Sequence, residues 1–303
     1  MLGRSFLWVS EKPRVEKLIT EGSLTRNLVD RFVAGNTLED AVGAIKELNS
    51  RGIGGILDHL GEGVADARGA QDAANDYLAA VKRIEETRLD TTVSIKLTQL
   101  GLAFDKQRCI EHVHALASEA QAAGARMEID IEQSQYVTDT LEVYRTLQAD
   151  FPDLRVALQA YMRRTPVDLE TMASLRPRIR LVKGAYAEPR AVAFQKKSEI
   201  DAQYAFLIDW LFEKGTDPAI ASHDGKLLAH AKQTAASAGD GKTNFEIQML
   251  YGVRRDLQEQ LASEGYRVRT YVPYGSAWYP YLTRRIAERP SNLLFSLRAF
   301  VGK

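Results

Sequence analysis

Residues 91–132 have the sequence TTVSIKLTQLGLAFDKQRCIEHVHALASEAQAAGARMEIDIE. Two short β-rich runs, TTVSIKL and RMEIDIE, stand at its ends. Between them, residues 107–123 have the apolar spacing of an amphipathic helix. A strand, a helix and a second strand in this order predict a strand–helix–strand unit of the kind that builds parallel sheets.

The same alternation continues on both sides of this unit. The other β-rich runs are GIGGILDHL, LRVALQAY, RIRLVKGAY, PAIASHD, NFEIQML and YRVRTYVPYG, and helical segments such as residues 67–88 and 203–214 lie between runs. Roughly eight strand–helix units of about 30 residues each favour an α/β fold, a (β/α)8 TIM-type barrel, over an open doubly wound sheet.

The N-terminal section has a different pattern. Residues 15–33 and 38–48 both show helical periodicity, and Thr37 followed by Asp40 resembles a capping box. No Gly-, Ser- or Pro-rich linker separates this section from the rest. We therefore expect an N-terminal helical addition over residues 1–50 and one barrel domain over residues 51–303.

The composition limits the classes of function. Of the 303 residues 45% are hydrophobic, and 40 Lys and Arg balance 40 Asp and Glu, so no bulk charge favours nucleic acid or an anionic membrane. The one cysteine, Cys109, excludes an internal disulfide framework and suggests a reducing compartment. The apolar run in the start MLGRSFLWVS is too short for a signal peptide, and no window approaches the length of an apolar membrane span. We expect a soluble, cytoplasmic protein that at most touches a membrane from outside.

Polar residues follow the predicted strands where each apolar run stops. In a parallel barrel the active site lies at the carboxyl ends of the strands, so these residues should meet at one mouth. They are Asp58 with Glu62, Lys96, Asp130, Gln159, Lys183 with Gly184, His223 with Asp224, Gln248 and Tyr271. Isolated buried charges are costly, and opposite charges on Lys96 and Asp130 therefore suggest a site.

The run RIRLVKGAY is the most unusual of the predicted strands. Strand alternation places Arg180, Val182 and Gly184 on one face and Leu181 and Lys183 on the other, with cations on both faces. Such a strand is a poor core element. Gly184 and the following alanine reduce side-chain bulk, which lets a ligand lie against the backbone, although an ordinary tight turn explains them equally well.

The stretch YLTRRIAERP predicts the helix after the last strand. Tyr281, Arg284, Arg285 and Glu288 fall on one helical face. A solvated outer face would explain this pattern, as it does for most adjacent arginines. The chain contains two other adjacent arginine pairs, Arg163–Arg164 and Arg254–Arg255, which favour that simpler interpretation. The charged stretch QKKSE is likewise most simply interpreted as solvated charge.

Several familiar catalytic motifs are missing. No G-x-G-x-x-G follows a strand into a helix, and there is no P-loop, H-E-x-x-H or G-x-S-x-G. Five histidines, including His112 and His114 on one predicted surface helix, do not form a metal cluster, so we expect no metal. A barrel aldolase that uses Lys96 or Lys183 as a Schiff-base nucleophile is the alternative enzyme, and a non-catalytic binding barrel is a further alternative.

Several stretches of the chain resemble the motifs of a known family. RLVKGAYAEP, FEIQMLYGVRRDL, and YVPYG followed by YLTRRIAE are similar to the motifs of proline dehydrogenases, in the family's order. The resemblance extends from LDHLGE to the end of the chain, and it is to the monofunctional bacterial type. It implies a distorted (β/α)8 barrel that holds FAD and oxidises L-proline to Δ1-pyrroline-5-carboxylate. Hydride would pass to flavin N5, and a membrane quinone would reoxidise the flavin.

The resemblance also implies roles for individual residues. The substrate carboxylate would be held by Lys96, Arg284 and Arg285, and the ring would pack against Tyr271, Tyr281 and Leu250. Asp130 corresponds to the active-site carboxylate, and Arg180 to the arginine beside flavin N5, so the implied catalytic residues are Asp130, Arg180 and Tyr271. The residues that would line FAD are Ile131, Gln159, Arg180, Val182, Lys183, Gly184, Ala185, Ser222 and His223.

Gating and localisation follow from the same resemblance. Glu62 would pair with Arg284 over bound proline, and Glu288 would hold an arginine when substrate is absent. Peripheral contact with the inner face of the cell membrane and a homo-oligomer are both compatible with it. Two positions depart from the family pattern: Ser222 replaces a frequent threonine, and Ala187 stands where the bifunctional relatives carry tryptophan.

Overall fold

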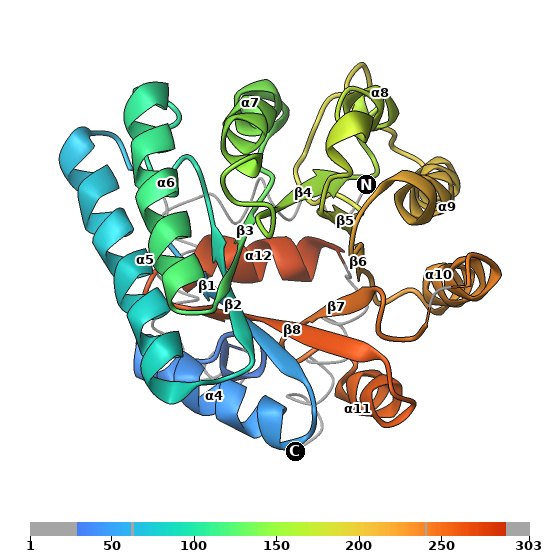
Figure 1. The fold of residues 1–303 in the computed structure, drawn as a ribbon, viewed down its shortest axis with the longest axis horizontal. Helices are drawn as coiled ribbons and strands as arrows, with labels where there is room; N and C mark the ends of the chain where they lie inside the picture. The colour runs from blue at the N-terminus through green and yellow to red at the C-terminus, as the bar shows by residue number, and fades with distance from the viewer. Residues whose placement is uncertain (1–28, 62–63, 240, 289–303) are drawn as a thin grey trace.

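The computed structural model describes residues 29–61, 64–239 and 241–288, with side chains described as far as Thr283. Within these residues eight parallel strands form a closed barrel in chain order, each paired with the next and β8 paired with β1 (Figure 1). The strands are β1 Gly54–His59, β2 Thr91–Ile95, β3 Arg126–Ile129, β4 Arg155–Gln159, β5 Ile179–Val182, β6 Ala219–Ala221, β7 Glu246–Leu250 and β8 Arg267–Tyr274. The predicted TIM-type barrel is confirmed.

Most of the helices connect the strands and surround the barrel (Figure 1). They are α4 Leu38–Ser50, α5 Ala67–Thr87, α6 Lys106–Ala122, α7 Val137–Gln148, α8 Thr165–Glu170, α9 Lys197–Lys214, α10 Gly225–Ser237, α11 Arg255–Ser263 and α12 Trp278–Glu288, with short 3-10 turns at Ser134–Tyr136 and Ala173–Leu175. Side-chain caps fix several of the starts. Asp66 accepts a hydrogen bond from Gly69 N at 2.8 Å, and Asp105 accepts one from Arg108 N at 3.0 Å.

Helix α4 begins with the predicted capping box. The Thr37 side chain accepts from Asp40 N at 3.2 Å, and Asp40 accepts from Thr37 N at 2.9 Å. The helix packs against β1 and β8, and its Ala41 and Ile45 belong to the main hydrophobic core. It therefore covers the seam between the first and last strands. Of the predicted helix over residues 15–33, residues 15–28 lie outside the described residues, and residues 29–32 are helical.

Helix α12 lies in a different position from α4. In Figure 1, α4 lies beside the barrel, whereas α12 crosses the middle of the view. Tyr281 and Leu282 of α12 are buried in a small second cluster with Phe32, Val33 and Leu60. Because Leu60 directly follows β1, this cluster attaches α12 to the carboxyl end of the barrel, the end where a barrel enzyme places its site.

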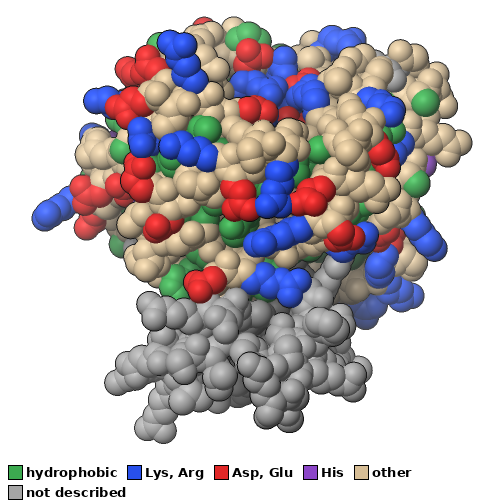
Figure 2. All heavy atoms as spheres, turned by 90° about the horizontal axis from the view of Figure 1, so that it is seen from below, with side chains coloured by type: hydrophobic (Ala, Val, Ile, Leu, Met, Phe, Trp, Pro, Cys, Tyr) green, Lys and Arg blue, Asp and Glu red, His purple; other side chains and the backbone are tan. Residues whose placement is uncertain are grey.

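Charges of both signs are mixed on the face of the molecule in Figure 2. Over most of the face in Figure 2, Lys and Arg side chains are interspersed with Asp and Glu. None of the helices in the described part of the chain combines the length and the apolar character that crossing a bilayer requires. Cys109 is buried, as expected for a packing residue, and burial raises the pKa of its thiol to about 12.

Candidate active site

A cavity of about 580 Å³ lies at the carboxyl end of the barrel, which is a size suited to a cofactor or small-molecule ligand. The polar residues predicted at the strand ends line it from all sides. They are Asp58, Lys96, Asp130, Gln159, Lys183, Gly184, His223, Asp224, Gln248 and Tyr271, joined by Ile131, Arg180, Val182, Ala185, Ser222, Leu250 and Tyr281. The sequence therefore located this cavity correctly within the described residues.

Lys96 is the centre of the first cluster in the cavity. Its ammonium pairs with Asp58, lies 3.1 Å from Asp130 Oδ2 and donates to the Tyr271 hydroxyl at 3.4 Å. Tyr271 in turn donates to Asp130 Oδ2 at 2.5 Å. Asp58, Lys96 and Asp130 lie at or just after the ends of β1, β2 and β3, whereas Tyr271 lies within β8 and not at its end as predicted. Closure of the barrel brings these four strands together. Asp58 is 1% exposed, and its charge is stabilised by Lys96.

Arg180 is the centre of the second cluster. It projects from β5 and is 4% exposed. One terminal nitrogen pairs with Asp130, while Nε and the other terminal nitrogen donate to Glu128 Oε2 at 2.8 and 2.5 Å. The guanidinium also lies 5.4 Å from the centre of the Tyr271 ring. Asp130 thus joins the two clusters, because it contacts both cations.

Mutual neutralisation keeps these buried groups ionised. Burial, the largest single effect on each group, favours the neutral form. For Lys96 it is outweighed by Asp58, Tyr271 and Asp130, which raise the pKa of the amine well above its usual range. For Asp130 the opposing charges of Lys96 and Arg180 lower the pKa of the carboxyl. Burial and the nearby Asp130 raise the pKa of the Tyr271 phenol, so that Tyr271 is a hydrogen-bond donor.

The cavity also contains buried amides with unused acceptors. Gln159 is 2% exposed and donates through Nε2 to the Glu132 carbonyl at 2.7 Å, while its Oε1 has no protein partner. Gln248 donates to Glu246 at 2.7 Å, and its Oε1 is also without a partner. A buried acceptor without a partner is costly, so both side chains are suited to receive hydrogen bonds from a ligand.

The end of β5 differs from the predicted pattern in two respects. Arg180 is not a poor core residue, because the barrel interior supplies two carboxylates for it. Lys183 was expected on the face opposite Arg180, yet both line the cavity, because β5 ends at Val182 and the alternation ends with it. Gly184 has φ +110°, and a Cβ there would overlap the Tyr161 ring.

Beyond β5 a pair of lysines lies at the cavity edge. Lys183 donates to Asp201 at 2.6 Å and to Asp224 at 3.1 Å. Lys197, from the stretch interpreted above as solvated charge, has a side chain 72% exposed, but it lines the cavity and pairs with the same two carboxylates. The exposure of Lys197 agrees with the interpretation as solvated charge, and the start of α9 also brings this side chain to the cavity edge.

The SHD stretch after β6 contributes one well-defined side chain. His223 Nε2 accepts a hydrogen bond from Leu250 N at 2.9 Å, which holds the ring at the edge of the cavity. Ser222 is buried, and its hydroxyl oxygen accepts from Asp224 N at 3.1 Å. No cluster of three or more potential metal ligands occurs among the described residues.

The remaining predicted residues are only partly within the described structure. The Tyr281 side chain is buried and lines the cavity, as predicted. Arg284 and Arg285 belong to α12, but their side chains and that of Glu288 lie outside the described side chains, and Glu62 lies outside the described residues altogether.

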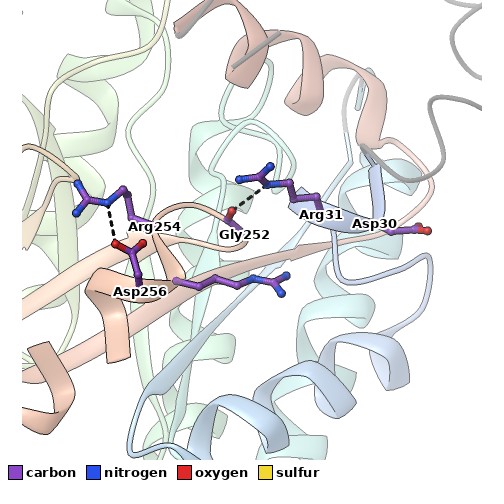
Figure 3. Close-up of a pocket in the computed structure, with 6 residues that line it drawn as sticks. Asp30, Arg31, Gly252, Arg254 and Asp256 are labelled. Carbon is purple, nitrogen blue, oxygen red and sulfur yellow. Dashed lines mark hydrogen bonds and ion pairs between the residues drawn. The ribbon is translucent and has the colours of Figure 1, made fainter. Parts of the chain in front are cut away.

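The pair Arg254–Arg255 lies in a different environment. It lines an open hollow on the surface together with Arg31 and Gly252 (Figure 3). Arg254 pairs with Asp256 at 3.5 Å, and Arg31 Nε donates to the Gly252 carbonyl at 3.3 Å. Neither Arg254 nor Arg255 lines the barrel cavity. This pair of arginines therefore lies outside the candidate site.

Sequence reasoning missed the charged interior below the cavity. Arg155 contacts Glu128 at 3.2 Å and Glu246 at 3.0 Å, and Glu246 contacts Arg269 at 3.1 Å. Each of these charges stands within one of the β-rich runs of the sequence, and that position was the available signal. A single strand, however, does not reveal which other strand supplies the counter-charge.

A closed parallel barrel with converging ionised side chains at its carboxyl end is the arrangement of a (β/α)8-barrel enzyme. Residues 41–298 match the family model described as Proline dehydrogenase. Proline dehydrogenase 1 of Bacillus subtilis (strain 168) is 39% identical over 303 residues, which is 100% of both chains. Proline dehydrogenase of Deinococcus radiodurans is 38% identical, covering 98% of this chain and 97% of that one.

A solved structure agrees with these sequence matches. Proline utilization A from Bdellovibrio bacteriovorus, inactivated by N-propargylglycine, has a TM-score of 0.83 at 26% identity. The match covers 88% of this chain and 33% of that one, so the chain spans about a third of its length. The chain belongs to the proline dehydrogenase family and is an enzyme of that class.

Proposed function

We propose that the chain catalyses the FAD-dependent oxidation of L-proline to Δ1-pyrroline-5-carboxylate and passes the electrons to a membrane quinone. The observation that carries the proposal is the arrangement of Lys96, Asp130, Tyr271 and Arg180 in one cavity of a proline dehydrogenase family barrel. This arrangement provides a cation for a substrate carboxylate and a fixed charge pair beside it.

The residues present fit a flavin cofactor. Gln159 Oε1 is a buried acceptor without a partner in a cavity large enough for such a group, and an oxidised flavin ring carries an N–H that can satisfy it. Arg180 supplies a positive charge, which favours the anionic reduced form of a flavin. Ile131, Val182, Lys183, Gly184, Ala185, Ser222 and His223 complete the proposed cofactor site.

Substrate recognition depends on charge and shape. Lys96 remains an ammonium ion and attracts the carboxylate of proline. Arg284 and Arg285 follow Tyr281 by three and four residues, on the same face of α12 as a side chain that lines the cavity. We assign them a two-sided hold on the carboxylate, because a guanidinium offers a planar fork of donors. Tyr271 and Tyr281 form walls for the ring, together with Leu250.

Catalysis on this proposal is largely a matter of positioning. When bound, FAD would supply a two-electron acceptor for the hydride from the ring carbon beside nitrogen, while the ring nitrogen forms the double bond to that carbon and gives its proton to solvent. Lys96 and the α12 arginines hold the carboxylate so that this carbon faces the acceptor. Asp130 stays ionised and holds Lys96, Arg180 and Tyr271 in place. Glu62 paired with Arg284 would close the site over substrate, and Glu288 would hold an arginine in its absence.

The aldolase alternative is disfavoured by the charge state of the lysine. A Schiff-base nucleophile needs a neutral amine, which buried lysines achieve through a lowered pKa. The pKa of Lys96 is raised instead. Lys183 is occupied by Asp201 and Asp224. The same proposal includes cytoplasmic localisation and a homo-oligomer. It also includes peripheral contact with the inner face of the membrane, because the protein must reach a membrane quinone.

The absorption spectrum of the purified protein tests the proposal. Flavin bands that bleach when L-proline is added under anaerobic conditions, and return with a quinone, are the expected result. Gln159→Leu should weaken flavin retention, because it removes the unpaired acceptor; Gln107→Leu on the exposed face of α6 is the control. The proposed function would be refuted if the protein takes up no flavin on reconstitution. It would also be refuted if the bound flavin stays oxidised after L-proline is added.

A further inference from the structure

Glu128 lies directly beneath the arginine of the cavity. It belongs to β3, two residues before Asp130, and its side chain is 1% exposed. Two nitrogens of Arg180 donate to Glu128 Oε2, at 2.8 and 2.5 Å. Asp130 lines the cavity, whereas Glu128 does not. The guanidinium therefore has one counter-charge within the site and a second one behind it.

The position of the Glu128 carboxylate is fixed by three other strands. Glu128 Oε1 accepts from Thr92 Oγ1 of β2 and from Arg155 of β4, each at 3.2 Å. Gln248 Nε2 of β7 lies 3.2 Å from both oxygens. Despite burial, the nearby Arg180 and Arg155 lower the pKa of the Glu128 carboxyl, which favours its negatively charged form.

We propose that Glu128 is a positioning residue that partly neutralises Arg180 and thereby lowers the reduction potential of the bound flavin; this inference rests on the proposed function. Reduction of a flavin adds negative charge, which a nearby cation stabilises. A buried anion behind that cation weakens the stabilisation of the reduced flavin. The low polarisability of the protein interior keeps the attraction between this anion and the cation strong. Asp130 cannot provide this control alone, because it also neutralises Lys96.

The test uses the flavin-loaded protein and the variant Glu128→Gln, which keeps shape and removes charge. The equilibrium constant for reduction of the flavin, measured against a reference dye, should rise on the order of tenfold, which is about 30 mV for a two-electron couple. The KM for proline should change little, because Glu128 does not line the cavity. An unchanged equilibrium constant would overturn the inference.

A matched control separates this effect from a general loss of buried charge. Glu246 is as buried as Glu128 and contacts Arg155, Arg269 and Gln248, but it makes no hydrogen bond or ion pair with Arg180. Glu246→Gln should leave the equilibrium constant within about twofold of the wild type. An equal rise in both variants would also overturn the inference.

A second variant covers the case in which Glu128→Gln fails to retain flavin. Glu128→Asp keeps the charge but withdraws it from Arg180 by one methylene, and it should raise the equilibrium constant by roughly threefold. No rise in Glu128→Asp would overturn the inference. A wild-type flavin that proline bleaches, combined with unshifted variants, would refute only the role of Glu128. A wild type without flavin would refute the proposed function itself, and the inference with it.

Discussion

The Tyr271 hydroxyl donates a hydrogen bond of 2.5 Å to Asp130 Oδ2, joining two residues that are 141 positions apart in the chain. Tyr271 belongs to β8 and Asp130 follows β3, with β1 and β2 between these strands in the barrel. The bond therefore spans the cavity mouth, and it exists only because the barrel is closed. Lys96 touches both residues, which makes the three a single electrostatic unit.

Lys96→Met should destabilise the fold. The substitution leaves Asp58 as a buried charge without its cation, which costs about 3–5 kcal/mol. The double variant Lys96→Met with Asp58→Asn should recover much of the loss, because the remaining group is neutral. Chemical denaturation measures both. The control is Lys106→Met, which removes an exposed cation and should leave the melting temperature unchanged. Equal losses in the single and double variants would contradict the pairing.

The contribution of Asp130 to stability should be constant around neutral pH. Its pKa is lowered in the folded state, so the stabilisation is present above the unfolded value of about 3.9 and is lost as the pH falls through the folded value. The pKa of Lys96 is raised, so its contribution is present below about 10.4 and is lost at higher pH.

Melting temperatures of the wild type and Asp130→Asn measure this dependence. The difference between them should be the same from about pH 5 to pH 9 and should shrink in acid. A difference that changes steeply near pH 7 would show that Asp130 titrates there and is not held ionised by its cations.

Gly184→Ala should destabilise the protein by about 1–3 kcal/mol. The residue has φ +110°, and the added Cβ would overlap the Tyr161 ring beside the cavity. Gly43→Ala is the matched control, because Gly43 lies within α4 with open space around the position of a Cβ. It should stabilise by about 0.5–1 kcal/mol. Thermal unfolding of the two variants in opposite directions is the expected outcome.

Arg285→Met should lower kcat/KM for proline by roughly 10- to 150-fold, because a hydrogen bond to a charged group contributes about 1.5–3 kcal/mol. Arg285→Lys should recover only part of the loss, since an ammonium lacks the planar fork of donors. The double variant Arg254→Met with Arg255→Met is the control and should leave proline kinetics nearly intact, because these residues line the surface hollow. Equal damage from the control pair, without loss of folding, would show that α12 does not hold the carboxylate.

The sequence by itself determined the barrel and the location of the cavity. Short β-rich runs separated by amphipathic segments are a local property, and each ended in a polar residue such as Lys96 or Asp130. Because parallel strands of a barrel share one carboxyl end, that local property was enough to bring these residues to one mouth. The capping box of Thr37 and Asp40 was equally readable, since it involves only neighbours along the chain.

Only the tertiary structure decided how the charges are paired and which way the chain turns at the cavity. Arg180 meets Glu128 and Asp130 from β3, and nothing in the β5 sequence identifies these partners. Lys183 joins Arg180 in the cavity because β5 ends at Val182. Helix α4 covers the seam between β1 and β8, while α12 brings Tyr281 to the cavity. Such pairings depend on contacts between strands and helices far apart in sequence, so they are fixed only when the barrel closes.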